Sequence, residues 1–245
     1  MNLIIDIGNT RIKAALFENA ELKHFFVFES TNALIEAALF ENYAVKHCIV
    51  ASVVENVEPF IDQLKERTQT LAFTSQMPLP LINLYQSANT LGSDRLAAAV
   101  GGASLFPGKN VVVIDAGTCL KYNFVNSNNE FIGGSISPGL KMRFKALNTF
   151  TSKLPLLVVN EKFDTLIGTT TAESILSGVE IGIIAEVEGL IDSYKQLFPN
   201  INVVLTGGDA NFFEKRLKKP IFADSYLILK GLNIILNHNL KISHF

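Results

Sequence analysis

The apolar positions near the start of the chain follow the pattern of a hairpin. The apolar run Leu3–Ile5 leads into Asp6. The segment Gly8–Thr10 then has the composition of a tight turn, and Arg11–Phe17 returns to an extended pattern. Buried strands joined by turns that contain glycine and asparagine have this pattern. We therefore expect two antiparallel strands here, followed by a third strand at Lys23–Glu29.

The rest of the first half alternates between helical and extended patterns. Apolar residues at helical spacing or in continuous runs predict helices and strands in turn: helices at Asn32–Phe40, Pro59–Thr68 and Ser93–Phe106, and strands at Cys48–Val53 and Thr70–Thr74. This order is typical of an α/β domain with a mixed sheet. The stretch Ser75–Leu91 has two prolines and no periodicity. It is too apolar for a disordered segment, so we expect a binding loop.

The hairpin pattern recurs in the second half of the chain. Val111–Val125 aligns with the first hairpin and repeats its aspartate, glycine, threonine and lysine: Asp115, Gly117, Thr118 and Lys121 correspond to Asp6, Gly8, Thr10 and Lys13. The repeat distance is far too long for a solenoid, so it indicates a duplicated domain. We expect one domain at residues 1–108 and a second at residues 109–245.

The second half continues with the same kinds of element. Strands are predicted at Asn110–Ala116, Leu120–Val125, Glu130–Ser135 and Asn202–Leu205, and helices at Gly139–Leu147, Ala172–Leu197 and around Lys230–Asn237. The longest helix, Ala172–Leu197, has apolar residues at helical spacing as far as Leu197. Gly178 and Gly182 lie one turn apart on it. Such a notch permits close approach of another helix, from the same chain or from a second subunit.

The two hairpin turns carry groups that suit phosphate. Successive backbone N–H groups, the Thr10 hydroxyl and the Lys13 ammonium surround a small concavity with the Asp6 carboxylate at its edge. Backbone amides in such a turn form an anion-binding nest, and a carboxylate beside it can hold a cation. The structural alternative is an ordinary hairpin in which Asp6 and Asn9 make local turn hydrogen bonds. Because the turn is duplicated, we favour two turns that clamp a polyphosphate.

A second polar cluster, Gly92-Ser-Asp-Arg95, lies where a helix is expected to begin. Ser93 as the N-cap and Asp94 in the first turn would suit a purely structural role. A cation in the first turn is electrostatically misplaced, so Arg95 points to a ligand with a carboxylate. In the segment Gly168–Glu173, Thr170 and Glu173 have the spacing of a capping box. Thr171 is not needed for that cap and can offer its hydroxyl to a ligand.

The composition limits the functions that the chain can have. Its 245 residues carry a net charge of −2, which argues against nucleic acid or a membrane surface as the main partner. The four histidines are scattered, and Cys48 and Cys119 lie far apart in apolar strands. Two free thiols are typical of a reducing compartment. No apolar run approaches the roughly 20 residues of a membrane span, so we expect a cytoplasmic protein.

These motifs together resemble one family, the type III pantothenate kinases. The resemblance rests on their order and spacing over nearly the whole chain: Asp6-Ile-Gly-Asn-Thr-Arg-Ile-Lys13, Gly92-Ser-Asp-Arg95, Asp115-Ala-Gly-Thr118, Gly133-Gly-Ser-Ile-Ser-Pro-Gly139, Gly168–Glu173 and Thr206-Gly-Gly208. It implies an α/β, actin-like ATPase fold of two duplicated ribonuclease H-like domains, with mixed sheets flanked by helices and ATP in the cleft between them. It also implies phosphorylation of the primary hydroxyl of pantothenate, a homodimer, magnesium with ATP, and a monovalent cation, either potassium or ammonium.

The resemblance also implies a role for each residue of the matching motifs. The ATP-binding positions are Asp6, Ile7, Gly8, Asn9, Thr10, Arg11, Ile12, Lys13 and Thr118. The pantothenate-binding positions are Tyr85, Gly92, Ser93, Asp94, Arg95 and Thr171. Asp94 matches the catalytic base, and Asp115 matches the potassium ligand. Two departures stand out: Ser93 replaces a frequent alanine, and Cys119-Leu120 replace alanine and threonine.

Two other functions fit parts of the sequence. A kinase of the same superfamily that acts on a sugar or acetate would need both phosphate turns but not the Gly92–Arg95 cluster. A non-catalytic regulatory relative would keep the fold without needing Asp94. The presence of Asp94 together with both turns favours the pantothenate kinase.

Overall fold

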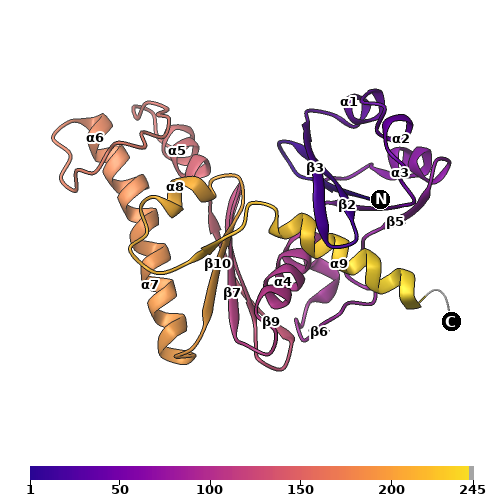
Figure 1. Ribbon diagram of the computed structural model, residues 1–245. Helices are drawn as coiled ribbons and strands as arrows, with labels where there is room; N and C mark the ends of the chain where they lie inside the picture. Colours follow the sequence, from indigo (N-terminus) through magenta and orange to yellow (C-terminus); the bar gives the residue numbers. More distant parts are fainter. Residues whose placement is uncertain (243–245) are drawn as a thin grey trace. The chain divides into compact units, whose positions relative to one another are not determined.

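In the computed structural model, which describes residues 1–242, the first hairpin belongs to a five-stranded mixed sheet (Figure 1). Its strands are β1 (Asn2–Ile7), β2 (Ile12–Glu18), β3 (Glu21–Phe28), β4 (His47–Ser52) and β5 (Gln69–Ala72), in the order β3-β2-β1-β4-β5. β1 pairs with β2 in the antiparallel direction and with β4 in the parallel direction. The apolar run that precedes Asp6 is fully buried, as expected for a central strand.

The second hairpin forms the centre of another mixed sheet. Its strands are β7 (Val111–Ala116), β8 (Cys119–Val125), β9 (Glu130–Pro138), β10 (Asn202–Thr206) and β11 (Phe222–Ala223), in the order β11-β10-β7-β8-β9. The start of β9 also pairs with a short strand, β6 (Ile82–Asn83). The duplication extends to the register: Asp6 lies opposite Lys13 in the first hairpin, and Asp115 lies opposite Lys121 in the second.

Helices cover both sheets, which confirms the predicted α/β class. The first half contains α1 (Thr31–Glu36), α2 (Leu39–Asn42), α3 (Glu58–Lys65), the 3₁₀ turn η1 (Ala88–Thr90) and α4 (Ser93–Leu105). The second half contains α5 (Leu140–Thr149), α6 (Thr171–Leu176), the π-helical turn η2 (Ser177–Ile181), α7 (Gly182–Leu197), α8 (Ala210–Glu214) and α9 (Leu227–Ile242).

The terminal helix α9 packs closely against α4 (Figure 1). A Cβ added at Gly101 would lie 2.6 Å from the Leu227 carbonyl oxygen, and one added at Gly231 would lie 1.9 Å from the Ala97 carbonyl oxygen. Both helices therefore need glycine where their backbones meet.

The chain divides into two compact units. Unit 1 consists of residues 1–107, 128–132 and 226–245, and unit 2 consists of residues 108–127 and 133–225. The break after Pro107 lies beside the boundary expected at residue 108. The division differs from contiguous domains because α9 packs on α4 and the start of β9 pairs with β6.

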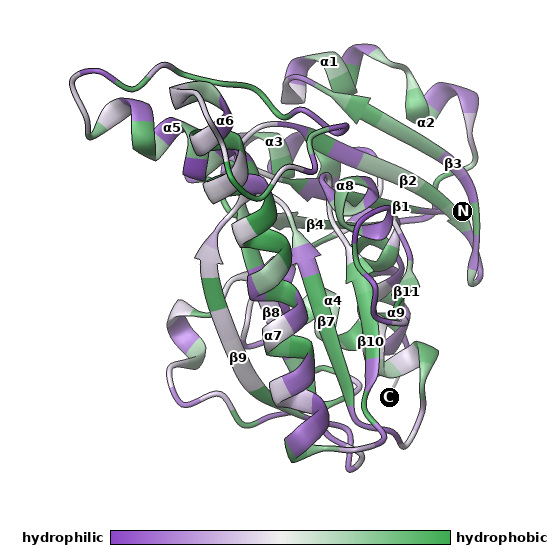
Figure 2. Ribbon diagram, turned by 90° about the vertical axis from the view of Figure 1, so that its left-hand side faces the viewer, coloured by the Kyte–Doolittle hydropathy of each residue, from purple (hydrophilic) through white to green (hydrophobic). Residues whose placement is uncertain are grey.

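The core of unit 2 lies between its sheet and the long helical segment α6–η2–α7. Figure 2 shows β7 and β10 as largely hydrophobic strands, and every residue of β7 is buried. Ile175, Val179, Ile183 and Val187 lie on the buried face of the helical segment, as predicted. Leu197, which was expected to continue this stripe, is 72% exposed. It lies in the last turn of the helix, beyond the packed part of the stripe.

Several short elements and two interruptions of helices were not predicted, among them the 3₁₀ turn η1. The strands β6 and β11 and the helix α8 are too short to show a periodic pattern. The helix expected at Asn32–Phe40 is broken at Ala38, which adopts a left-handed conformation with φ of 53°. The helix expected at Ala172–Leu197 contains the π-helical turn η2. The buried residues Ile175, Val179, Ile183 and Val187 are each four positions apart, a spacing that an ordinary α-helix also allows, so the pattern did not reveal the wider turn.

Candidate active site

The first phosphate turn lies at the end of β1 in unit 1. The Gly8 N–H donates a hydrogen bond to the Arg11 carbonyl oxygen at 3.1 Å, and this bond closes the turn. Asn9, Thr10 and Arg11 are exposed, so the tip of the turn is open to a ligand. An ordinary hairpin would have the same hydrogen bond, so this bond does not distinguish the two interpretations. The exposed tip is the feature that is compatible with phosphate binding.

The second phosphate turn lies between β7 and β8 in unit 2. The Gly117 N–H donates to the Cys119 carbonyl oxygen at 3.1 Å, and Thr118 is exposed at the tip. Lys121 Nζ donates to Asp115 Oδ2 at 2.7 Å, and the two side chains are only 15% and 7% exposed. The aspartate of the second turn is therefore already paired with a cation from its own hairpin.

Two glycines from other segments of the chain, Gly139 and Gly207, pack against the backbone of the second turn. A Cβ added at Gly139 would lie 2.3 Å from the Gly117 carbonyl oxygen, and one added at Gly207 would lie 2.3 Å from the Ala116 carbonyl oxygen. Gly207 also has a φ of 103°, which favours glycine. Gly208, in contrast, has open space around an added Cβ. Gly139 and Gly207 must therefore be glycines, because their backbone lies so close to the second turn that no Cβ would fit.

The cluster Gly92–Arg95 forms the start of α4, but its cap differs from the prediction. Ser93 is not the N-cap: Gly92 holds that position in an extended conformation. The Ser93 hydroxyl instead donates to the Ser52 carbonyl oxygen at 3.2 Å. The helix start is thereby tied to the end of β4. Asp94 lies in the first turn and is partly exposed, and its Oδ1 accepts a hydrogen bond from the Arg95 N–H at 2.8 Å.

Arg95 lies against two aromatic rings that neighbour each other. Its guanidinium carbon lies 5.3 Å from the centroid of the Tyr85 ring and 5.8 Å from that of Phe131, and the residue is 5% exposed. Cation–π contacts of this kind stabilise a buried guanidinium. They offer a second explanation for a cation in the first helical turn, besides a bound carboxylate. The predicted pair Tyr85 and Arg95 is brought together, whereas Phe131 gave no sequence signal because it is one apolar residue in a strand.

The predicted capping box is present at the start of α6. The Thr170 hydroxyl accepts the Glu173 N–H at 3.2 Å, and Glu173 accepts hydrogen bonds from the N–H groups of Thr169 and Thr170. The Thr169 hydroxyl also donates to this carboxylate, and these hydrogen bonds lower the pKa of Glu173. Thr171 takes no part in the cap and is exposed, which leaves its hydroxyl available.

The π-helical turn η2 holds the irregular segment that leads to Thr171. The Ser177 hydroxyl donates to the Leu166 carbonyl oxygen at 2.5 Å. The buried Glu180 accepts the Asn160 N–H at 2.7 Å and forms an ion pair with Arg216 at 3.0 Å. Burial raises the pKa of Glu180, although these partners act in the opposite direction. The side chains of Ser177 and Glu180 therefore hold the segment before α6 at Leu166 and at Asn160.

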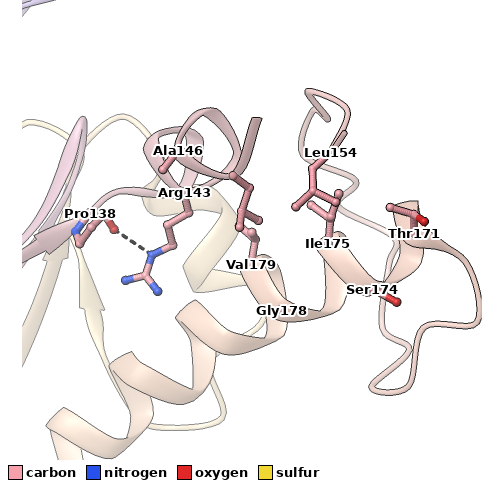
Figure 3. A pocket seen from close by; sticks show the side chains of 10 residues that line it. Pro138, Arg143, Ala146, Leu154, Thr171, Ser174, Ile175, Gly178 and Val179 are labelled. Carbon is pink, nitrogen blue, oxygen red and sulfur yellow. Dashed lines mark hydrogen bonds between the residues drawn. The ribbon is translucent and has the colours of Figure 1, made fainter. Parts of the chain in front are cut away.

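Thr171 also lies on the rim of a pocket of about 580 Å³ between α5 and α6–η2 (Figure 3). The walls are mainly apolar and include Leu147, Leu154 and Val179. At the opposite end, Arg143 Nε donates to the Pro138 carbonyl oxygen at 2.9 Å, and its guanidinium pairs with Glu186. The charge of the arginine is therefore balanced within the unit, and the open part of the pocket suits apolar groups.

The predicted site residues fall into both units. The first phosphate turn, Tyr85 and Gly92–Arg95 belong to unit 1, while Asp115, Thr118 and Thr171 belong to unit 2. Within residues 1–242, no group of three or more His, Cys, Asp or Glu side chains is arranged to hold a metal ion. Over the same residues, no helix has the length and apolar character of a membrane span.

The sequence is similar to a well-defined family. The family model described as type III pantothenate kinase matches residues 2–193. A type III pantothenate kinase of Bacteroides fragilis is 46% identical over 240 residues, which cover 98% of this chain and 98% of the relative. One of Cytophaga hutchinsonii is 45% identical over 239 residues, which cover 98% of this chain and 100% of the relative.

Solved structures support the fold. A Campylobacter jejuni protein assigned to the Baf family of transcriptional activators has a TM-score of 0.65 at 22% identity, over 98% of this chain and 99% of that one. The activator of 2-hydroxyisocaproyl-CoA dehydratase from Clostridium difficile, solved with ADPNP, has a TM-score of 0.56 at 13% identity, over 99% and 96%. A ROK family glucokinase of Streptomyces griseus has a TM-score of 0.50 at 14% identity, over 97% and 99%. At these identities the similarity shows the fold alone.

Proposed function

The chain belongs to the type III pantothenate kinase family, and on this premise we propose that it transfers the γ-phosphoryl group of ATP to pantothenate. The acceptor is the primary hydroxyl, and the product is 4'-phosphopantothenate, the first intermediate of coenzyme A biosynthesis. The observation that carries the proposal is the placement of Asp94 at the open start of α4, directly before the stacked Arg95. A substrate that carries a carboxylate would account for a buried arginine in the first turn of the helix.

The first turn binds the ATP phosphates through its N–H groups, the Thr10 hydroxyl and Lys13. Thr118, at the tip of the second turn, is a further ATP contact. Both tips are exposed, and turns of this kind bind anions through their backbone dipoles. Magnesium enters with ATP and neutralises part of the phosphate charge.

Asp94 accepts the proton of the attacking hydroxyl. As the hydroxyl oxygen bonds to the γ-phosphorus, the bond from that phosphorus to the β,γ-bridging oxygen breaks and ADP leaves. Phosphoryl transfer has a loose transition state, so the proton can leave the hydroxyl late. A carboxylate in the first turn of α4 is therefore sufficient as a base.

Pantothenate is held by groups around the start of α4 and, in the proposed dimer, by Thr171 of the partner subunit. Arg95 binds its carboxylate while the rings of Tyr85 and Phe131 lie against the guanidinium. Gly92 leaves the approach to Asp94 open, because it has no side chain. The Ser93 hydroxyl already donates to Ser52, so Ser93 contributes through its backbone.

The active protein is a homodimer that uses the surface around Thr171. The irregular segment between α5 and α6 exposes several large apolar side chains beside the pocket: Phe150, Leu156, Val158, Leu166 and Ile167 are 59–85% exposed. Exposed apolar surface of this extent is typical of an interface. A second copy related by a twofold axis would cover it with the same residues. The compartment is the cytoplasm, in agreement with the two free thiols of Cys48 and Cys119.

The proposal is tested by the choice of acceptor. The purified protein is assayed for ADP release from ATP and magnesium with pantothenate, glucose or acetate as the acceptor, each over the same concentration range. Release that depends on pantothenate and is absent with the other two acceptors supports the proposal. Release with glucose or acetate would assign the site to another kinase of this fold, and no release with any acceptor would contradict an enzymatic role.

A further inference from the structure

Asp115 has a largely buried cationic partner in its own hairpin. Lys121 lies directly opposite Asp115 in the β7–β8 hairpin, and its Nζ lies 2.7 Å from Asp115 Oδ2. Both side chains are largely buried. A pair at this distance and burial is held much more firmly than a surface ion pair. The hairpin thus carries its own cation next to the carboxylate.

A carboxylate beside bound phosphates creates an electrostatic problem. Asp115 directly precedes the turn that ends in Thr118, so its negative charge adds to that of the nucleotide. The repulsion between this carboxylate and the phosphates is removed if a cation lies against the carboxylate. The family resemblance leads one to expect a monovalent ion there. The residues present fit a free monovalent ion poorly. Asp115 Oδ2 already accepts a hydrogen bond from the Lys121 ammonium group, which is covalently attached to the chain.

We propose that the Lys121 ammonium takes the place of this monovalent cation, so that nucleotide binding and phosphoryl transfer need no added potassium or ammonium. The proposal rests on the function proposed above. Lysine has a compact, singly charged ammonium head with three donors. It supplies the charge of a monovalent ion at a fixed position. Lys121 is thus a positioning residue that acts through Asp115 and the turn.

The competing interpretation is a structural pair. Opposite charges facing each other across two strands stabilise a hairpin, and that role alone would leave the enzyme dependent on a free cation. The two interpretations differ in what the wild-type protein does in different salts. They also differ in whether a free cation can replace a deleted lysine.

The first test uses wild-type protein in matched chloride buffers of sodium, potassium, ammonium or tetramethylammonium. Affinity for a non-hydrolysable ATP analogue is measured by calorimetry, and turnover with ATP and pantothenate is measured in parallel. We expect both quantities to agree within about twofold across the four salts, because the cation is covalently attached. A loss of tenfold or more in sodium that potassium restores, in either measurement, would overturn the proposal.

The second test removes the ammonium in two ways. Lys121→Ala leaves space that a free cation can fill, whereas Lys121→Met fills the same space without charge. We expect a roughly 100-fold loss of turnover in sodium for both, the usual size for a lost electrostatic group in an active site. Potassium or ammonium should restore turnover and analogue affinity in part for Lys121→Ala but not for Lys121→Met. Lys109→Ala, which changes an exposed lysine before β7, is the matched control.

The outcomes separate this inference from the proposed function. If no salt supports phosphorylation of pantothenate, the function is contradicted, and the affinity for the ATP analogue in the four salts still decides the role of Lys121. Near-native turnover of Lys121→Met in sodium would show that the pair is only structural. If either variant fails to fold, as judged by circular dichroism, the comparison of salts with wild-type protein decides alone.

Discussion

The guanidinium of Arg95 lies over the ring of Tyr85, at 5.3 Å from its centroid. Tyr85 comes from the long loop before η1, and Arg95 comes from the first turn of α4. The loop is fixed because the Leu84 N–H donates to the Phe131 carbonyl oxygen at 3.0 Å. The arginine is thus contacted by aromatic rings from two other segments, and in the proposed function it binds the carboxylate of pantothenate.

Arg95→Lys is expected to weaken pantothenate binding. Lysine keeps the charge but loses the planar, two-pronged set of donors and most of the stacking. We expect KM for pantothenate to rise at least tenfold, as for the loss of about 1.4 kcal/mol or more, while KM for ATP changes little. Arg67→Lys, which changes an arginine that lies over the Phe40 ring, is the matched control. A variant whose KM for pantothenate stays at the wild-type value would exclude Arg95 from substrate binding.

Asp94→Asn is expected to abolish most of the turnover. The amide cannot accept the hydroxyl proton, and loss of a general base costs roughly 100-fold or more in kcat. Affinity for an ATP analogue should stay near the wild-type value, because Asp94 lies outside the two phosphate turns. Kinetic assays and calorimetry check the two parts. Turnover within about twofold of wild type would rule out this residue as the base.

Gly207→Ala is expected to displace the second phosphate turn. The added Cβ would lie 2.3 Å from the Ala116 carbonyl oxygen, and the residue has a φ of 103°. Overpacking of this kind costs about 1–3 kcal/mol of unfolding free energy, and affinity for the ATP analogue should fall with it. Gly208→Ala is the control, since its Cβ meets open space. Urea unfolding that gave equal stabilities for the two variants would argue against close packing at Gly207.

The capping box predicts a pH dependence. Hydrogen bonds lower the pKa of Glu173 in the folded protein. A carboxyl whose folded pKa is depressed stabilises the protein above its unfolded pKa, and this stabilisation is lost as the pH falls through the folded pKa. Wild type should therefore have a higher Tm than Glu173→Gln at pH 7, and the difference should vanish in acid. A difference in Tm that did not change with pH would mean that the charge of Glu173 contributes nothing to the cap.

Gly178→Leu tests the proposed dimer. No atom of the described chain outside the neighbouring turn lies within 4 Å of a Cβ added at Gly178, so the monomer should tolerate a larger residue there. A second copy packed on the pocket would meet that side chain. Gly189→Leu, also in open space on α7, gains the same helix propensity and is the control. We expect only Gly178→Leu to weaken self-association in sedimentation and to raise KM for pantothenate. A fully active wild-type monomer would end the dimer proposal.

Much of the fold could be predicted because its main elements have strong patterns. The duplicated hairpins could be predicted from the apolar runs that end at Asp6 and Asp115. In the structure both hairpins have the same register, with the aspartate opposite the lysine. The cap of α4 was predicted wrongly, because the preference of serine for N-caps is a local rule. Here the tertiary bond from Ser93 to Ser52 determines its position.

The parts of the site that could not be predicted depend on contacts between distant segments. Phe131 reaches Arg95 only because β9 pairs with β6. Lys121 was recognised as a repeat of Lys13, but its pairing with Asp115 required the register of β7 and β8. Glu180 faces inward in the π-helical turn, and a helical pattern alone would not place a charged residue there.

The most direct test of the central claim is phosphorus NMR of the product formed by the purified protein from ATP, magnesium and pantothenate. The account predicts a new phosphomonoester on the primary hydroxyl of pantothenate, formed together with an equal amount of ADP. It also predicts that Asp94→Asn forms almost none of this product under the same conditions. Pantothenate left unphosphorylated by folded wild-type protein that binds both ligands would contradict the account.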